Sequence, residues 1–202
     1  MKTAVVGAGP AGLIAAATAA AGSDVTLFER NEKPGKKLYI TGKGRCNVTN
    51  LCSPREFLEK VVRNPKFLYS AIYTFTPEDT VNLIETNGVK TKTERGNRVF
   101  PASDKASDVT KALVSNAMKA GVQFVYENVV SLSRKDGLFR LITSGAEYFF
   151  DKVILACGGV SYPSTGSNGD GFKLAESMGH TVTKLYPALV PVNFCEDVKS
   201  LQ

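Results

Sequence analysis

The chain has 202 residues and a formal net charge of +6, and 43% of its residues are hydrophobic while 22% are charged. This composition is typical of a globular domain with a hydrophobic core and argues against intrinsic disorder. Four cysteines without a C-x-x-C pair and a single histidine, His180, indicate neither a disulfide scaffold nor a zinc-ligand set. We therefore expect a cytoplasmic protein with reduced thiols and no bound metal.

The positive charge is concentrated in one part of the sequence. Ten Lys and Arg but only three Asp and Glu lie between Arg30 and Lys66. A single basic segment fits one bound anion better than a long nucleic-acid duplex, so nucleic acid is not the expected partner.

The first 28 residues have the pattern of a β-α-β unit. Short apolar runs at 3–6 and 25–28 flank a helix-length stretch of small residues at 10–21, and glycines separate the first run from the helix. Parallel strands joined in this way open a doubly wound α/β sheet. The glycines and a proline interrupt an otherwise apolar N-terminus, which argues against a secretory signal. Because no apolar stretch approaches the ~18 residues of a membrane span, no membrane association is expected.

The rest of the chain is predicted to add a lobe and a meander to this sheet. Segment 31–50 has several glycines and no apolar period, so an extended loop is expected. A small helical lobe is expected at 51–103, with helices at 54–63 and 78–86, the second opening with Thr76 as its cap. The remaining predicted elements are a helix at 104–120, a strand at 122–126, an antiparallel β-meander at 129–150, a strand at 152–156 and a helix at 171–178.

Residues 7–12 read G-x-G-x-x-G between the first strand and the first helix. The first glycine permits a tight turn, the second lets a pyrophosphate approach the backbone, and the third lets the helix pack on the strand. Glu29 follows the second strand, where a carboxylate can accept both hydroxyls of an adenosine ribose and would repel a 2′-phosphate. A dinucleotide site accounts for the strand, the spacing and the acid together, whereas a glycine-rich turn beside a surface glutamate does not.

Three further blocks carry a specific resemblance. Residues 35–50 read GKKLYITGKGRCNVTN, residues 96–101 read GNRVFP and residues 156–171 read ACGGVSYPSTGSNGDG. In order and spacing they resemble the signatures of the aminoacetone-oxidase-like, or BaiN-type, NAD(P)/FAD-dependent oxidoreductases. Two departures, an inserted Asn97 and Cys157 in place of the usual threonine, affect the expected loop shape rather than the cofactor.

The resemblance implies a doubly wound, Rossmann-like FAD-binding fold of the two-dinucleotide-binding-domain type over residues 1–202. It also implies a small-molecule substrate and hydride transfer through flavin N5. Family members are longer and insert a substrate lobe after a segment that residues 187–191 match. Residues 187–202 are therefore expected to begin a lobe that this chain does not complete, and a separate chain is one possible source of the remainder.

Carried over by position, the resemblance assigns cofactor contacts along much of the chain. The glycine motif is expected to bind the pyrophosphate, Glu29 the ribose, and the backbone of Val129 the adenine. The expected cofactor-binding residues are Gly7, Gly9, Pro10, Ala11, Gly12, Glu29, Arg30, Lys36, Lys37, Leu38, Gly42, Arg45, Cys46, Asn47, Val129, Ala156, Gly158 and Gly159. No catalytic acid or base is assigned.

The cations of the predicted loop 31–50 indicate an anion site independently of the resemblance to the family. A doubly charged pyrophosphate needs donors, and Lys36, Lys37, Lys43 and Arg45 follow the second predicted strand. Arg45 is the strongest candidate, because its planar guanidinium suits either a phosphate or the flavin pyrimidine edge. The alternative is a basic loop that faces water.

Several other residues have competing interpretations. Cys46 and Cys52 have a C-x5-C spacing that does not match a flavin disulfide reductase, so Cys46 is interpreted as a packed or cofactor-adjacent thiol. His180 is expected to satisfy carbonyls at a helix end and Asp170 to cap a helix. Tyr162 either faces the flavin or packs against the protein.

The sequence therefore predicts an FAD-binding oxidoreductase, with NAD(P)H as a candidate transient reductant and poor turnover by this chain alone. Two alternatives remain open. A flavin-dependent RNA-modifying enzyme would use the same dinucleotide turn, and a non-catalytic remnant would bind FAD without reacting.

Overall fold

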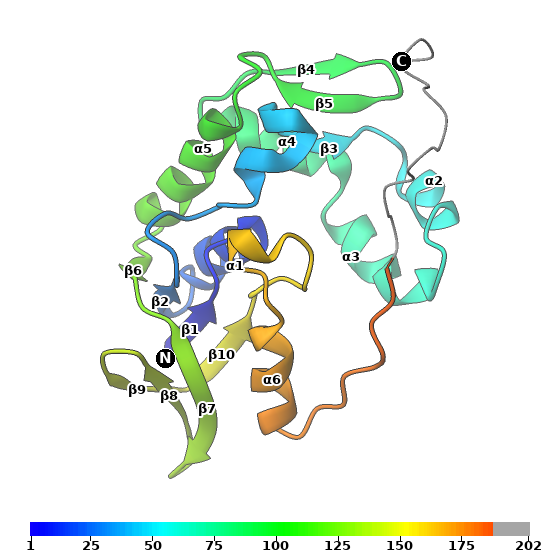
Figure 1. Ribbon diagram of the computed structural model, residues 1–202. Helices are drawn as coiled ribbons and strands as arrows, with labels where there is room; N and C mark the ends of the chain where they lie inside the picture. The colour runs from blue at the N-terminus through cyan, green and yellow to red at the C-terminus, as the bar shows by residue number, and fades with distance from the viewer. Residues whose placement is uncertain (188–202) are drawn as a thin grey trace, which may run out of the picture.

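The computed structural model describes residues 1–187, and the expected start of a substrate lobe lies almost entirely outside the described residues. Its centre is a parallel sheet with the strand order β10-β1-β2-β6 (Figure 1). The strands are β1 (Lys2–Val6), β2 (Asp24–Phe28), β6 (Gln123–Val125) and β10 (Lys152–Leu155). Val5 of β1 lies opposite Leu27 of β2 and Ile154 of β10. The predicted doubly wound α/β arrangement is confirmed.

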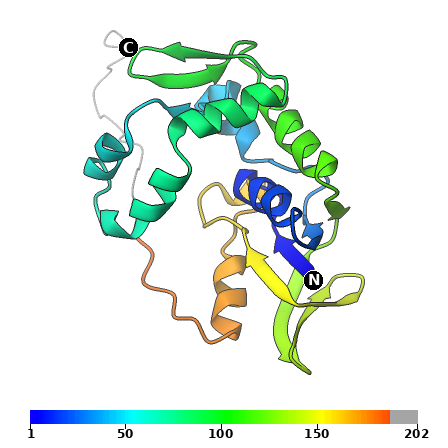
Figure 2. The ribbon, with the colours of Figure 1, turned by 180° about the vertical axis from the view of Figure 1, so that it is seen from behind.

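Alternate residues of β1 point to opposite faces of the sheet, and each face has its own core. On one face Val5 belongs to a cluster with Leu13 of α1 (Pro10–Ala19) and Leu113 of α5 (Ala106–Lys119). Figure 2 shows these two helices side by side over the sheet. The small residues of α1 allow it to lie close to the strands.

The other face of the sheet is covered by the predicted meander and by α6 (Asp170–Ser177). Strands β7 (Val129–Lys135), β8 (Leu138–Thr143) and β9 (Glu147–Phe150) form an antiparallel sheet in that order. Phe28 of β2 meets Tyr148 and Phe150 edge to face, with ring centroids 5.1 and 5.8 Å away. Both faces of the parallel sheet are thus buried, which explains its continuous apolar runs.

Two helices of the lobe begin with a capping box, and the one at Thr76 starts the helix where the sequence predicted its cap. In α4 (Pro77–Thr86) the Thr76 hydroxyl accepts a hydrogen bond from the Asp79 N–H, and the Asp79 carboxylate accepts one from the Thr76 N–H at 2.8 Å. Ser53 and Glu56 form the same capping box at the start of α2 (Pro54–Glu59). These hydrogen bonds lower the pKa of Asp79 and of Glu56, because each favours the charged carboxylate.

The sequence predicted a helical lobe at 51–103, but this lobe also contains β-strands. After α2, η2 (Pro65–Leu68), α3 (Tyr69–Thr74) and α4 comes a hairpin of β4 (Thr91–Glu94) and β5 (Arg98–Pro101), and β3 (Thr49–Asn50) pairs with β5. The prediction missed β4 because its sequence, TKTE, is polar throughout. Gly96 and Asn97 in the hairpin turn have φ values of 77° and 58°, so the inserted Asn97 occupies a turn position that favours asparagine.

Other boundaries also differ. Helix α2 ends at Glu59, not at Arg63, and α3 was not predicted. The predicted loop at 31–50 contains the 3-10 segment η1 (Leu38–Gly44) and strand β3. Among the helices of residues 1–187, none has the length and apolar character needed to cross a bilayer.

Candidate functional site

A cleft opens where β1, β2 and β10 end, at the edge of the sheet where ligands of doubly wound folds bind. Its volume is about 310 Å³, at the lower end of the range for small-molecule sites. Eleven of the predicted cofactor residues line it: Gly7, Gly9, Pro10, Ala11, Glu29, Arg30, Lys36, Lys37, Val129, Ala156 and Gly158. The fold therefore brings segments from four separate parts of the chain to one cleft.

The glycine motif has the geometry that each glycine was predicted to provide. Gly7 has a φ of 103°, and a Cβ there would lie 2.6 Å from the Ala156 carbonyl oxygen. A Cβ on Gly12 would lie 1.8 Å from the Gly7 carbonyl oxygen, so Gly12 packs the helix behind the turn and does not line the cleft. A Cβ on Gly9 would meet nothing within 4 Å. The space in front of Gly9 is therefore open to a ligand.

The N-terminus of α1 faces this open space. Gly9 is its cap residue and provides no side chain, and Pro10 occupies the first turn. The first N–H groups of a helix lack partners within it and carry partial positive charge. The geometry fits a pyrophosphate at this end of the helix.

Glu29 is almost fully buried, with 6% of its surface exposed, and it supports the turn directly. Its Oε2 accepts a hydrogen bond from the Ala8 N–H at 2.8 Å. Its Oε1 accepts two, from the Asn31 N–H at 2.8 Å and from Asn31 Nδ2 at 2.7 Å. A carboxylate offers about four acceptor positions, so about one remains, on Oε2. In this arrangement Glu29 can accept one ribose hydroxyl, whereas the sequence suggested two.

Polar contacts fix the segment 161–170, of which residues 165–168 and Asp170 line the cleft. Lys37 Nζ donates to the Ser161 carbonyl oxygen and to Ser167 Oγ, both at 2.7 Å. Arg30 pairs with Asp170 at 2.8 Å. Among residues 1–187, the one ion pair of Lys36 is a 3.8 Å contact with the exposed Glu32, which leaves its ammonium group able to bind an anion.

The remaining predicted residues, Leu38, Gly42, Arg45, Cys46, Asn47 and Gly159, do not line the cleft. Gly42 serves the local turn, because it has a φ of 55° and a Cβ there would lie 2.9 Å from the Asn47 amide nitrogen. Their contact with a cofactor remains a prediction.

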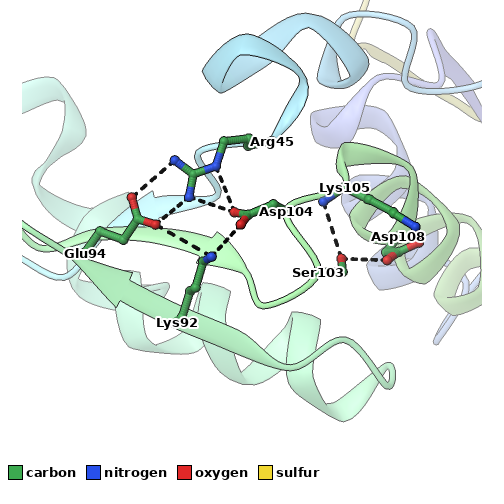
Figure 3. A network of polar contacts seen from close by, with 7 residues as sticks. All are labelled: Arg45, Lys92, Glu94, Ser103, Asp104, Lys105 and Asp108. Atoms are coloured by element: carbon green, nitrogen blue, oxygen red, sulfur yellow. Dashed lines mark hydrogen bonds and ion pairs between the residues drawn. The ribbon is translucent and has the colours of Figure 1, made fainter.

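Arg45, the strongest predicted phosphate ligand, is bound to carboxylates of its own protein (Figure 3). Its guanidinium contacts Glu94 of β4 and donates from Nε to Asp104 at 2.8 Å. Lys92 Nζ completes the network at 2.6 Å from Asp104. The Arg45 guanidinium also lies 4.2 Å from the centre of the Phe100 ring. Arg45 thus ties η1 to the β4–β5 hairpin.

The network shifts the pKa values of its carboxyl groups. The hydrogen bond from Arg45 lowers the pKa of Glu94, and hydrogen bonds from Lys92 and then Arg45 lower that of Asp104. Both carboxylates therefore stay charged at neutral pH and occupy the guanidinium that a phosphate would need.

The cysteines within residues 1–187 form no disulfide. Cys46 is 1% exposed within the α1–α5 core, and burial raises its pKa. Cys46, Cys52 and Cys157 all have free thiols. Cys157 lines the cleft, where burial raises the pKa of its thiol to about 11. No group of three or more potential metal ligands occurs within residues 1–187.

Three single-residue predictions are revised. Asp170 does not cap α6, because Gly169 is the cap residue and the Asp170 carboxylate pairs with Arg30. The His180 side chain is exposed, and its backbone N–H, not its imidazole, donates to the Ala175 carbonyl. Tyr162 is 66% exposed with a φ of 52°, so it does not pack in the core.

Sequence reasoning missed several cleft residues, among them Asn31, Glu127, Ser167 and Asp170. Asn31 follows Glu29 by two residues and shows no signal beyond that position. Ser167 and Asp170 lie in the quoted block 156–171, which placed them near the site without giving them a role.

Over residues 1–188 the chain matches the family described as HI0933-like protein Rossmann domain. It belongs to this family. The match covers nearly the whole chain and agrees with the resemblance to BaiN-type flavoproteins.

Two curated proteins and one solved structure extend the comparison. The chain is 37% identical to the 3-dehydro-bile acid delta(4,6)-reductase of Clostridium scindens over 92% of this chain and 46% of that protein. It is 34% identical to the ribosomal RNA dihydrouridine synthase of Escherichia coli over 93% of this chain and 46% of that protein. It therefore spans about half the length of these relatives. Thermovibrio ammonificans THI4 superposes with a TM-score of 0.53 at 19% identity, covering 89% of this chain and 63% of that one, which shows a shared fold.

Proposed function

We propose that this chain forms the FAD-binding part of a flavin-dependent reductase. The observation that carries the proposal is the open space in front of Gly9, at the N-terminus of α1 and near the buried carboxylate of Glu29. A pyrophosphate fits that space, and an adjacent ribose would reach the remaining acceptor position of Glu29. The membership of the family supports the same cofactor.

The residues of the cleft have separate roles in this proposal. The N–H group of Ala11 and the ammonium of Lys36 would hold the pyrophosphate, and the backbone at Val129 would contact the adenine. When bound, FAD supplies hydride chemistry at N5. Residues 161–170, held by Lys37 and Arg30, would limit the access of water to the cofactor.

The reaction we propose is the saturation of a carbon–carbon double bond. A delta(4,6)-reductase and a dihydrouridine synthase are both named for such a reduction, although one acts on a bile acid and the other on RNA. We propose that the substrate of this chain contains a carbon–carbon double bond and that NAD(P)H supplies the electrons for its reduction. Free thiols at Cys46 and Cys157 fit a cytoplasmic protein.

An RNA-modifying enzyme is the second candidate, because two of the curated relatives are named as ribosomal RNA dihydrouridine synthases. A non-catalytic FAD-binding protein is the third. The chain alone is expected to turn over slowly, because about half the length of its relatives is not part of it and a second polypeptide segment would have to position the substrate.

The absorbance spectrum of the purified protein tests the cofactor. Bands near ~450 nm after removal of free flavin are expected, and calorimetry on the apoprotein should give tighter binding of FAD than of NADPH. Tighter binding of NADPH would contradict the proposal. Turnover is tested separately by NAD(P)H oxidation with this chain and with a version extended to the length of the relatives, where only the extended version should be fast.

A further inference from the structure

Asn31 lies between two parts of the cleft and is not among the residues that the sequence assigned to the cofactor. Its backbone N–H and its side-chain Nδ2 both donate to Glu29 Oε1, at 2.8 and 2.7 Å. On its other side, Nδ2 lies 3.4 Å from the Thr165 carbonyl oxygen. Asn31, Glu29 and Thr165 all line the cleft. Asn31 thus joins the end of β2 to the 3-10 segment η3 (Pro163–Thr165).

The lack of a side chain at Gly166 makes room for the Asn31 amide. Gly166 has a φ of 99°, and a Cβ there would lie 2.8 Å from Asn31 Nδ2 and 3.4 Å from its Oδ1. The amide therefore lies between this glycine and the buried carboxylate of Glu29. A side chain that is packed in this way holds its hydrogen bonds with little freedom to rotate.

The two bonds from Asn31 fix the orientation of the Glu29 carboxylate. A free carboxylate rotates about its last side-chain bond, and its two oxygens are then equivalent. Here Oε1 accepts twice from Asn31, and Oε2 accepts once from the Ala8 N–H. The acceptor position that remains is therefore on Oε2, at a defined place in the cleft. Asn31 determines which oxygen of Glu29 is left to a ligand.

We propose that Asn31 is a positioning residue for the adenosine half of a bound dinucleotide. By holding Oε1 of Glu29, it directs Oε2 toward a hydroxyl of the adenosine ribose. The inference rests on the proposed function, because it requires a dinucleotide whose ribose reaches Glu29. Its consequence is that a change at Asn31 removes the preference for the ribose hydroxyls without removing the site for the diphosphate.

The test compares the affinities of ADP and of 2′,3′-dideoxy-ADP for the flavin-free protein by calorimetry. The two nucleotides differ only in the ribose hydroxyls, so the ratio of their affinities measures the contribution of these hydroxyls alone. The wild type should prefer ADP about tenfold or more, the scale of a hydrogen bond to a charged group.

Asn31→Asp keeps the size of the side chain and places a carboxyl group against Glu29 Oε1. At pH 8 the two carboxylates repel each other, so Glu29 turns away and the preference for ADP should fall to about twofold or less. At about pH 5 the introduced carboxyl group takes up a proton, because the adjacent charge raises its pKa, and it then donates to Oε1 as the amide does. The preference should therefore recover toward the wild-type value, which a merely structural loss would not do.

The other charged and titratable groups of the cleft do not account for such a recovery. They face the same space in the wild type and in every variant, and both nucleotides carry the same diphosphate, so their effects cancel in the ratio. These groups are Arg30, Lys36, Lys37, Glu127, Cys157 and Asp170. The wild type provides the reference ratio at each pH.

Asn128→Asp is the matched control, because Asn128 also lines the cleft and the change adds the same charge while both bonds from Asn31 to Glu29 stay in place. It should weaken both nucleotides alike and leave the ratio unchanged. Asn31→Ala removes the Nδ2 bond and keeps the backbone donor, so its ratio should fall part of the way at every pH and should not recover on acidification. Circular dichroism verifies that each variant is folded.

The inference would be overturned by an unchanged ratio in both Asn31 variants, by an equal loss in the Asn128 control, or by a loss in Asn31→Asp that persists at pH 5. With a wild type that binds FAD, each of these results leaves the proposed function intact. A wild type that binds neither FAD nor ADP would instead contradict the proposed function, and with it the ribose site to which Asn31 contributes.

Discussion

Glu29 and Ala8 are joined by a buried hydrogen bond of 2.8 Å, donated by the Ala8 N–H to Glu29 Oε2. It ties the end of β2 to the turn that follows β1. A residue predicted to bind the ribose therefore also supports the turn that we propose receives the pyrophosphate, and its loss should affect folding and cofactor binding together.

Glu29→Gln should lower the free energy of unfolding by about 1 to 3 kcal/mol, because an amide cannot accept hydrogen bonds on both sides and leaves a buried donor unpaired. Urea denaturation of the apoprotein measures this loss. FAD affinity should fall as well. The control Glu32→Gln changes an exposed residue and should alter neither quantity appreciably. Unchanged stability of Glu29→Gln would show that the bonds to Ala8 and Asn31 contribute little.

Gly9→Ala should fold normally and lose FAD. The added Cβ meets nothing in the free protein, and the backbone at Gly9, with φ −72° and ψ 177°, suits alanine. The same Cβ would occupy the space through which the pyrophosphate approaches. The melting temperature of the apoprotein tests the folding, and a titration with FAD tests the binding.

Gly12→Ala is the contrasting variant. Its Cβ would lie 1.8 Å from the Gly7 carbonyl oxygen, so the helix must shift and the apoprotein should be destabilised. If Gly9→Ala bound FAD as tightly as the wild type, the cofactor could not lie against this turn.

Arg45→Gln should lower the melting temperature at neutral pH, because Glu94 and Asp104 lose their shared cation. The folded-state pKa values of both carboxyl groups are lowered, so the network's contribution is complete above their unfolded values and is lost as the pH falls through the folded values. The difference from the wild type should therefore shrink below about pH 4. Thermal denaturation between pH 7 and pH 3 measures it.

The same variant separates two roles for Arg45. If it is only a structural contact between η1 and the hairpin, FAD affinity should change little once stability is accounted for. A fall of about 1.5 to 3 kcal/mol in flavin binding, the scale of a charge-assisted hydrogen bond, would return Arg45 to the cofactor site.

Cys157 should react slowly with a thiol reagent at pH 8. With a pKa of about 11, about one thiol in a thousand is ionised at that pH, and the thiolate is the reactive form. Cys157→Ser should leave the number of rapidly labelled thiols unchanged, whereas Cys52→Ser, at a half-buried position with a free thiol, should reduce it by one. Rapid labelling of Cys157 at pH 8 would contradict the burial of its thiol.

The opening β-α-β unit, the glycine turn and the cap of α4 follow from local signals. Gly12 is required by a contact with Gly7, five residues before it, and the capping boxes involve residues three apart, whereas the contact that requires Gly7 is made with Ala156, far along the chain. Apolar runs of four or five residues between glycines were sufficient to place β1 and β2 because both faces of the sheet are buried.

Only the tertiary structure determines which charged side chains form ion pairs with one another. Lys36, Arg45 and Lys66 are cations of the same basic stretch, and the sequence does not indicate which partner each of them meets. Glu94 and Asp104 lie far from Arg45 along the chain, and only the packing of the β4–β5 hairpin beside η1 brings them to its guanidinium. Long-range pairing of this kind has no local pattern, so the sequence showed one basic segment where the structure has cleft cations, the Arg45 network and the exposed Arg63 and Lys66.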